Sequence, residues 1–150
     1  MDIMGIFRNE ILIVSLLSWL IAQVIKTIIH AIMYKGIDWK RLVGDGGMPS
    51  AHSATVTSLA ICTGLKCGFD SVYFAIAFVF AIVVMHDATG VRREAGKHAK
   101  ALNEIIEFLN REPASEEALK EFLGHTPLQV FFGALLGVIV SLVACLVVVP

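Results

Sequence analysis

Long apolar stretches separated by short polar segments predict four membrane-spanning helices in this chain. The first stretch runs from Ile11 to about Met33, and the last runs from Leu128 to Val149. The third, Val72 to Met85, is apolar without interruption and is extended by its flanks. The second, Pro49 to about Leu65, is rich in Ser, Thr, Ala and Gly, which suits a helix packed among other helices. A bilayer crossing needs roughly 20 residues, so each stretch is close to the required length.

The segment 91–124 differs from these stretches, because charged residues alternate there with apolar ones. Its apolar residues recur at helical spacing, at Ala95, Ala99, Leu102, Ile105, Ile106 and Leu109. This spacing predicts an amphipathic helix that lies on the membrane surface or over the mouth of the bundle. Pro113 is expected to end that helix, and a second short helix is expected to begin at Ser115 and end at Gly124.

Composition favours a membrane protein with one domain. Of the 150 residues, 57% are hydrophobic, and the mean hydropathy is +0.77. A soluble domain is typically about 45–50% apolar. We therefore predict one all-α integral membrane bundle over residues 1–150. A net charge of −1 gives no reason to expect nucleic-acid binding.

The cysteines do not form a recognisable framework. Cys62, Cys67 and Cys145 all lie in apolar stretches. An odd number of cysteines without metal-ligand spacing argues against a disulfide framework and against a zinc site. We expect all three to be small core residues.

Four spans divide the polar segments between two membrane faces. Residues 35–48 and 86–126 lie on one face, and both termini and the turn 66–71 lie on the other. The first face carries nine lysines and arginines, whereas the second carries only Arg8 and Lys66. The positive-inside rule predicts that the first face is cytoplasmic. We expect the protein to lie in the cell membrane.

Residues 46–53, Gly-Gly-Met-Pro-Ser-Ala-His-Ser, form a glycine turn that opens into the second helix. Gly47 lets the backbone approach a ligand closely, and Pro49 suits the first helical position. The N–H groups of a first helical turn can bind an anion, and His52 lies within one turn of that point. The segment predicts a phosphate pocket that contains an acid. The alternative is an ordinary capped helix start with one buried histidine.

A polar stripe on the first span carries Gln23, Lys26, Thr27 and His30 at i, i+3, i+4 and i+7. Ionisable groups inside a bilayer usually face a bundle interior or a wet cavity. The flexible stem of Lys26 could bring its ammonium towards the pocket. The alternative is a structural ion pair with a carboxylate such as Asp87.

Residues 86–93 close the third span, and residues 124–129 open the fourth. Arg92 and Arg93 can bind phosphate, and Asp87 would orient an arginine or a histidine. Membrane-surface anchoring is the alternative for the arginines, and a metal site is the alternative for the adjacent His86 and Asp87. His125 precedes the fourth helix on the same face as His52. Two histidines with cations between them suit phosphoryl transfer, in which one imidazole attacks phosphorus and the other protonates the leaving oxygen. His30 and His98 have weaker claims.

Together these segments resemble the divergent branch of the type 2 phosphatidic acid phosphatases, a family related to acid phosphatases and vanadium-dependent haloperoxidases. The matching segments span nearly the whole chain and are Gln23-x-x-Lys26, residues 46–53, Asp87-x-x-Gly90-Val91-Arg92-Arg93 and Gly124-His125-Thr126-Pro127.

The resemblance implies a metal-independent phosphatase, without a cofactor, that hydrolyses phosphomonoesters of membrane lipids. It would make His125 the nucleophile that forms a phosphohistidine, and His52 the acid for the leaving group. Ser50, Lys26 and one or both of Arg92 and Arg93 would contact the phosphate.

The chain departs from the wider superfamily pattern at four points. The lysine and arginine of the usual first motif do not stand at their spacing. Leu119 stands where that pattern has an arginine, and Gln129 stands where it has an aspartate. The membrane members have six spans rather than four. Gln129 could hold the His125 tautomer, but it also completes a Thr-x-x-Gln capping box with Thr126.

Two other functions therefore stay open beside the phosphatase. The first is a catalytically inactive protein that binds phospholipid headgroups or organises a membrane complex. The second is a transporter, since charged residues within spans often mark ion paths. The substrate class for an enzyme would be phosphatidate, phosphatidylglycerophosphate or a polyprenyl phosphate, and so small a bundle could form a homodimer.

Overall fold

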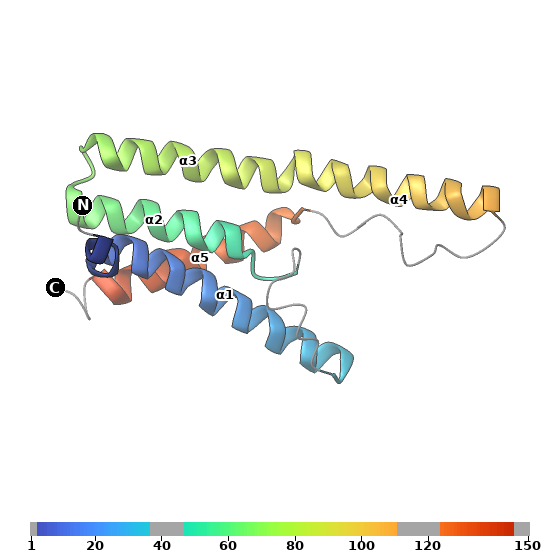
Figure 1. Cartoon of the computed structure of the whole chain (residues 1–150), viewed down its shortest axis with the longest axis horizontal. Coiled ribbons are helices and arrows are strands. Elements are labelled where there is room, and N and C mark those ends of the chain that lie inside the picture. The colour runs from blue at the N-terminus through green and yellow to red at the C-terminus, as the bar shows by residue number, and fades with distance from the viewer. Residues whose placement is uncertain (1–2, 37–46, 111–123, 146–150) are drawn as a thin grey trace.

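The computed structural model describes residues 3–36, 47–110 and 124–145, which form an all-α bundle with no strand among them (Figure 1). These residues form a short 3-10 helix and five α-helices: η1 (Ile3–Arg8), α1 (Glu10–Tyr34), α2 (Ala51–Cys67), α3 (Val72–Thr89), α4 (Val91–Asn110) and α5 (Pro127–Val143). Helices α1, α2, α3 and α5 occupy the four predicted apolar stretches, so the predicted fold class is confirmed. The short helix predicted from Ser115 lies outside the described residues.

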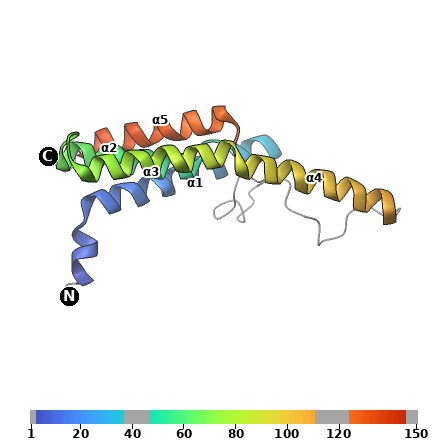
Figure 2. The same ribbon diagram turned by 90° about the horizontal axis from the view of Figure 1, so that it is seen from above.

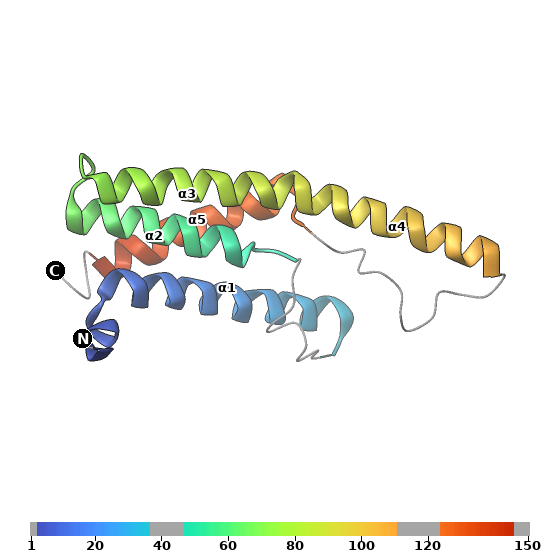
Figure 3. The same cartoon turned by 45° about the horizontal axis from the view of Figure 1, so that its top comes forward.

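Helix α2 is the centre of the bundle, with α1, α3 and α5 packed around it (Figure 1, Figure 3). Its buried residues are mostly small: Ala51, Ser53, Ala54, Val56, Ser58, Ala60, Cys62, Thr63 and Gly64. Small side chains let neighbouring helix backbones approach closely, which stabilises helices in a bilayer through van der Waals contact. The weak hydropathy of this stretch is therefore explained by burial among helices, as predicted.

Helix α5 approaches α2 through a stripe of small residues. A Cβ at Gly133 would collide with the carbonyl oxygen of Ser50, just before α2, and a Cβ at Gly137 would collide with that of Ala54 in α2. Four residues further along, the fully buried Ser141 places its hydroxyl 2.9 Å from the hydroxyl of Ser58 and 2.8 Å from the carbonyl oxygen of Gly137. These hydrogen bonds satisfy hydroxyl groups that would otherwise be costly to bury in an apolar environment.

Two of the three cysteines are joined across the same interface. Cys62 on α2 and Cys145, just beyond α5, form a disulfide between residues 83 positions apart, and both are buried. The expectation of unpaired core cysteines was therefore wrong for this pair. It was also wrong for Cys67, which is free but exposed. Spacing along the chain could not show the pairing, because the contact depends on how α2 and α5 cross.

The two ends of the bundle differ in their polar residues, as the predicted topology requires. Helix η1, the α2–α3 turn and the end of α5 lie together at one end (Figure 1). There the Lys66 ammonium lies 2.9 Å from a carboxylate oxygen of Glu10. The starts of α2 and α5 and the end of α3 lie at the opposite end, which carries the candidate chemistry.

Helix α4 continues the direction of α3 and projects beyond the rest of the bundle (Figure 2). This differs from the expected helix lying flat on the membrane or across the bundle mouth. Helical hydrogen bonds run through the junction, from Gly90 N to His86 O at 2.9 Å and from Glu94 N to Gly90 O at 3.0 Å. Gly90 therefore makes no sharp turn, and the two helices remain nearly collinear.

The outer surface of the bundle is apolar, as expected of a membrane protein. Large side chains such as Leu16, Ile28 and Val79 are 56%, 53% and 59% exposed. Among the described helices, α1 and the continuous α3–α4 segment are long and apolar enough to cross a membrane, and α5 is apolar but shorter. The four α1, α2, α3 and α5 helices thus form an all-α membrane bundle, whose central helix is the least apolar.

Candidate active site

The first turn of α2 begins two residues later than expected. Ser50 is the N-cap, and its hydroxyl accepts hydrogen bonds from the Ser53 backbone N–H at 3.3 Å and the Ser53 hydroxyl at 3.0 Å. Pro49 precedes the cap and is not the first helical residue, so that expectation was wrong. The Ser50 side chain is fully buried and caps the helix, and a phosphate contact from Ser50 stays a prediction.

The glycine turn before this helix lies against Lys26 of α1. Gly47 has a φ of +86°, a conformation that favours glycine, and a Cβ at this position would lie 3.1 Å from Cγ of Lys26. The Lys26 side chain is buried, with 4% exposed. The structure therefore brings together two residues predicted to bind phosphate. Gly46, the other glycine of the predicted turn, lies outside the described residues.

The polar stripe around Lys26 divides into a buried and a less buried part. Gln23 is 4% exposed, and its Oε1 has no hydrogen-bond partner among the described residues. Thr27 donates its hydroxyl to the backbone carbonyl of Gln23 at 2.9 Å, which is a local helix contact. His30 stacks on Tyr34 with ring centroids 4.5 Å apart. Only the Gln23 and Lys26 part of the stripe is held in the bundle interior.

The loop before α5 packs directly on the junction of α3 and α4. Gly124 has a φ of +84°, and a Cβ there would collide with the backbone of Arg92 and Arg93. The next residue, His125, donates its backbone N–H to the carbonyl oxygen of Ala88 at 2.9 Å and is only 3% exposed. Gly124 allows the loop to approach the α3–α4 junction closely, and the hydrogen bond to Ala88 holds the backbone of His125 in place there.

His52 and His125 meet at this end of the bundle. Their ring centroids are 6.0 Å apart, with the ring planes inclined by 60°. The bundle therefore brings two imidazoles, 73 positions apart in the sequence, into one cluster where both could contact a single bound group.

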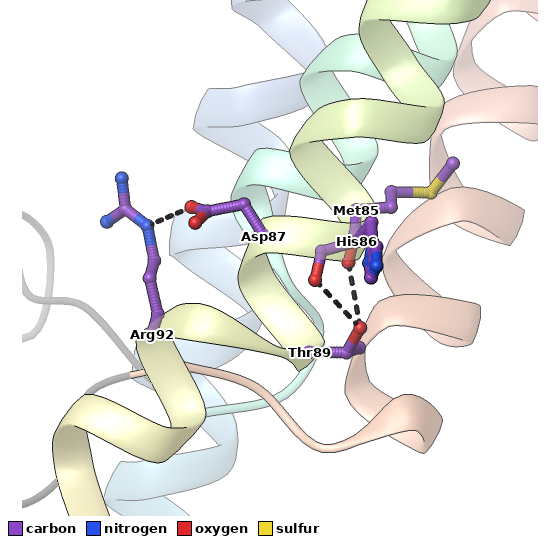
Figure 4. Close-up of polar contacts among 5 residues, drawn as sticks. All are labelled: Met85, His86, Asp87, Thr89 and Arg92. Atoms are coloured by element: carbon purple, nitrogen blue, oxygen red, sulfur yellow. Dashed lines mark hydrogen bonds and ion pairs between the residues drawn. The ribbon is translucent and has the colours of Figure 1, made fainter.

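A charged pair lies where α3 passes into α4. Arg92 Nε donates to Oδ2 of Asp87 at 2.7 Å, and the two side chains are 49% and 39% exposed (Figure 4). This contact orients the guanidinium and leaves its terminal nitrogens pointing away from the carboxylate (Figure 4). The sequence left open an ion pair between Asp87 and Lys26. In the structure the Asp87 carboxylate pairs with Arg92. Arg93 is exposed.

Gln129 caps the helix that follows His125. Its side-chain oxygen accepts from the Thr126 backbone N–H at 3.0 Å, and the Thr126 hydroxyl accepts from the Gln129 N–H at 3.4 Å. Both bonds of the capping box are present. The backbone carbonyl of Gln129 also accepts from Ser50 N–H at 3.0 Å, which ties the start of α5 to the start of α2. An orienting contact from Gln129 to the His125 ring stays a prediction.

Two further titratable features of the described residues lie on α4. On the exposed surface of α4, the Lys97 ammonium donates to Glu94 and lowers the pKa of that carboxyl. His98 is exposed on the same helix. Within residues 3–36, 47–110 and 124–145, no three His, Cys, Asp or Glu side chains are grouped for a metal ion. A metal-independent reaction stays a prediction.

Several contacts that build the site were missed by the sequence reasoning. Ser53 completes the cap, Ala88 supplies the carbonyl that holds the His125 backbone, and Gly133 permits the close approach of α5 to Ser50. The spacing of Gly133, Gly137 and Ser141 at intervals of four was visible in the sequence and could have predicted the α2–α5 interface. The role of Ala88 had no signal, because it uses only a backbone atom.

Comparison with known proteins places the chain beside membrane proteins. The model of the divergent PAP2 family matches residues 7–140. An uncharacterized membrane protein of Bacillus subtilis (strain 168), YuiD, is 41% identical over an alignment of 152 positions that covers 93% of this chain and 96% of the relative. No solved structure shows a significant match.

Proposed function

The chain belongs to the divergent PAP2 family, and from this premise we propose that it is a membrane phosphatase that hydrolyses the phosphomonoester of a membrane lipid. The observation that carries the proposal is the closeness of His52 and His125 at one end of an apolar bundle, where their ring centroids are 6.0 Å apart. In the proposal, Lys26, which is buried beside Gly47, and Arg92, whose guanidinium pairs with Asp87, supply positive charge to the bound phosphate. A dianionic phosphate at the membrane edge fits that combination of charge and position.

In the proposed reaction, neutral His125 attacks phosphorus and forms a nitrogen–phosphorus bond while the bond to the ester oxygen breaks. Protonated His52 gives its proton to the departing alcohol of the lipid. Water then attacks phosphorus, loses a proton to His52 and releases inorganic phosphate from His125. Lys26 and Arg92, and the N–H groups at the start of α2, would neutralise the charge on the phosphoryl oxygens.

A phosphate-release assay tests this proposal directly. The purified full chain in lipid vesicles is offered phosphatidate, phosphatidylglycerophosphate and a polyprenyl phosphate, with and without chelator. We expect release from at least one lipid, loss of release in His125→Ala and a severe reduction in His52→Ala. His98→Ala is the matched control, because His98 is exposed on α4 and should leave the rate unchanged. No release from any of these lipids would contradict the proposal.

A non-catalytic headgroup-binding function is the second candidate, and one observation favours it. The side chain of Gln129, at the position where the wider superfamily has a carboxylate, is used in the capping box. An amide cannot stabilise an imidazolium as a carboxylate does. This function predicts lipid binding that survives His125→Ala and weakens in Arg92→Ala. Trapping a phosphorylated histidine would exclude it.

We further propose that the histidine end of the bundle faces the cytoplasm and that the protein is in the cell membrane. The excess of lysine and arginine at that end supports this orientation. The Cys62–Cys145 disulfide lies towards the opposite end, and disulfides persist in oxidising environments outside the cytoplasm. A homodimer stays a prediction.

A further inference from the structure

A groove of about 240 Å³ runs along the bundle between α1 and α5. Every side chain that lines it is apolar: Ile25, Ile29, Met48, Pro49, Phe132, Leu135, Leu136 and Ile139. Leu135 and Ile139 are 44% and 50% exposed, so the groove borders the outer surface that would face lipid. A concave, wholly apolar surface at this depth can accept hydrocarbon and has no group to hold a polar ligand.

One end of this groove adjoins the candidate phosphate site. Met48 and Pro49 line the groove, and the residue before them, Gly47, packs against the stem of Lys26. On the other wall, Phe132 lies one turn after Gln129, whose carbonyl oxygen accepts from Ser50 N–H. The groove therefore begins at the segment, residues 47–50, that contacts Lys26 and starts α2.

The groove also runs in the direction that a lipid tail would take. Phe132 and Ile139 are seven residues apart on α5, which corresponds to roughly 10 Å along a helix axis. This path leads from the polar end of the bundle towards its middle, as an acyl chain leads from a headgroup into the bilayer. A phosphorylated headgroup beside Lys26 would place its chain along this wall.

We propose that the groove between α1 and α5 binds the first part of a hydrocarbon chain of the lipid phosphate whose headgroup lies between His52 and His125. The inference rests on the proposed function for the identity of the headgroup. A second groove, of about 470 Å³, lies between α1, α2 and α3 and is lined in part by Tyr73, Ile76 and Phe80. It begins beside Asn9, at the end of the bundle opposite the histidines, and serves as the comparison surface.

Photo-crosslinking tests the proposal without requiring turnover. The probe is a phosphatidate with a diazirine in the upper part of one acyl chain, present in phosphatidylcholine vesicles with the full chain. The His125→Ala variant prevents consumption of the probe. We expect crosslinks to concentrate on α1 and α5 along the groove. Unlabelled phosphatidate should displace them, whereas diacylglycerol and inorganic phosphate should not.

A matched pair of substitutions sharpens the test in the same background. Leu135→Trp fills the groove, and Ile76→Trp fills the comparison groove. Losing the burial of about two methylene groups corresponds to about tenfold weaker binding. We expect this loss for Leu135→Trp and unchanged binding for Ile76→Trp. The crosslink map of the protein without either tryptophan gives a second result should Leu135→Trp fail to fold.

The outcomes separate this proposal from the proposed function. Crosslinks spread evenly over all lipid-facing helices, or concentrated near Ile76, would refute binding of the hydrocarbon chain in the α1–α5 groove. Equal binding by the Leu135→Trp and Ile76→Trp variants would also overturn it. Suppose instead that unlabelled phosphatidate displaces the groove crosslinks in His125→Ala, but the unsubstituted chain releases no phosphate from any lipid tested. That pair of results would refute the phosphatase function and keep the proposed lipid site.

Discussion

The close contact between α2 and α5 can be tested by adding one methyl group to it. In Gly137→Ala, the new Cβ would lie 2.5 Å from the carbonyl oxygen of Ala54 and 3.0 Å from the backbone nitrogen of Ser58. Ordinary contacts between heavy atoms are about 3.5–4.0 Å, so the two helices would have to separate by about 1 Å. Overpacking of this kind typically costs about 1–3 kcal/mol in the free energy of unfolding.

The measurement is denaturant unfolding in mixed micelles, followed by helical circular dichroism. Gly36→Ala is the matched control, because the nearest described atom to a Cβ there is the Tyr34 carbonyl oxygen at 3.9 Å. We expect Gly137→Ala to unfold at lower denaturant and Gly36→Ala to match the unsubstituted chain. If the free energies of unfolding of the two variants agree within about 0.5 kcal/mol, the close α2–α5 packing is refuted.

Three further predictions concern the site and its orientation. Gly124→Ala should lower phosphate release by about 100-fold. The φ of +84° and the collision of a Cβ with the Arg93 backbone would displace His125, and an unchanged rate would contradict the position of His125 in the site. Asp87→Asn should change stability by no more than about 1 kcal/mol, since the pair with Arg92 is exposed, but should raise KM; an unchanged KM would argue against Arg92 as a phosphate ligand. Exposed Cys67 should react with a membrane-impermeant maleimide added to intact cells, and reaction only after permeabilisation would reverse the proposed orientation.

The sequence was sufficient to predict the helices, because their apolar stretches are long and the caps at their starts are short-range features. Ser50 and the Thr126–Gln129 box show such local control at the starts of α2 and α5. The structure differs from the sequence prediction at the start of α2 and at the junction of α3 and α4. Pro49 was predicted to be the first helical residue, but Ser50 caps the helix, and helical hydrogen bonds run through Gly90 from α3 into α4.

Less of the candidate site could be predicted from the sequence, because the site depends on contacts between segments far apart in the chain. The types of His52, His125 and Lys26 indicated phosphate chemistry, but their approach follows from helix crossing. Helix crossing in turn depends on which small residues face each other, and the disulfide between Cys62 and Cys145 has the same origin. Spacing along α5 marks the face that packs, but it does not show which residues of α2 that face meets.

The most direct test of the central claim is to trap a phosphorylated enzyme. The full chain is mixed briefly with a lipid substrate labelled in its phosphate, quenched in alkali, where phosphohistidine survives, and digested for mass spectrometry. The account predicts phosphate on the peptide that contains His125, and no labelled peptide from His125→Ala. Turnover without label on His125, or wild-type turnover by His125→Ala, would contradict it.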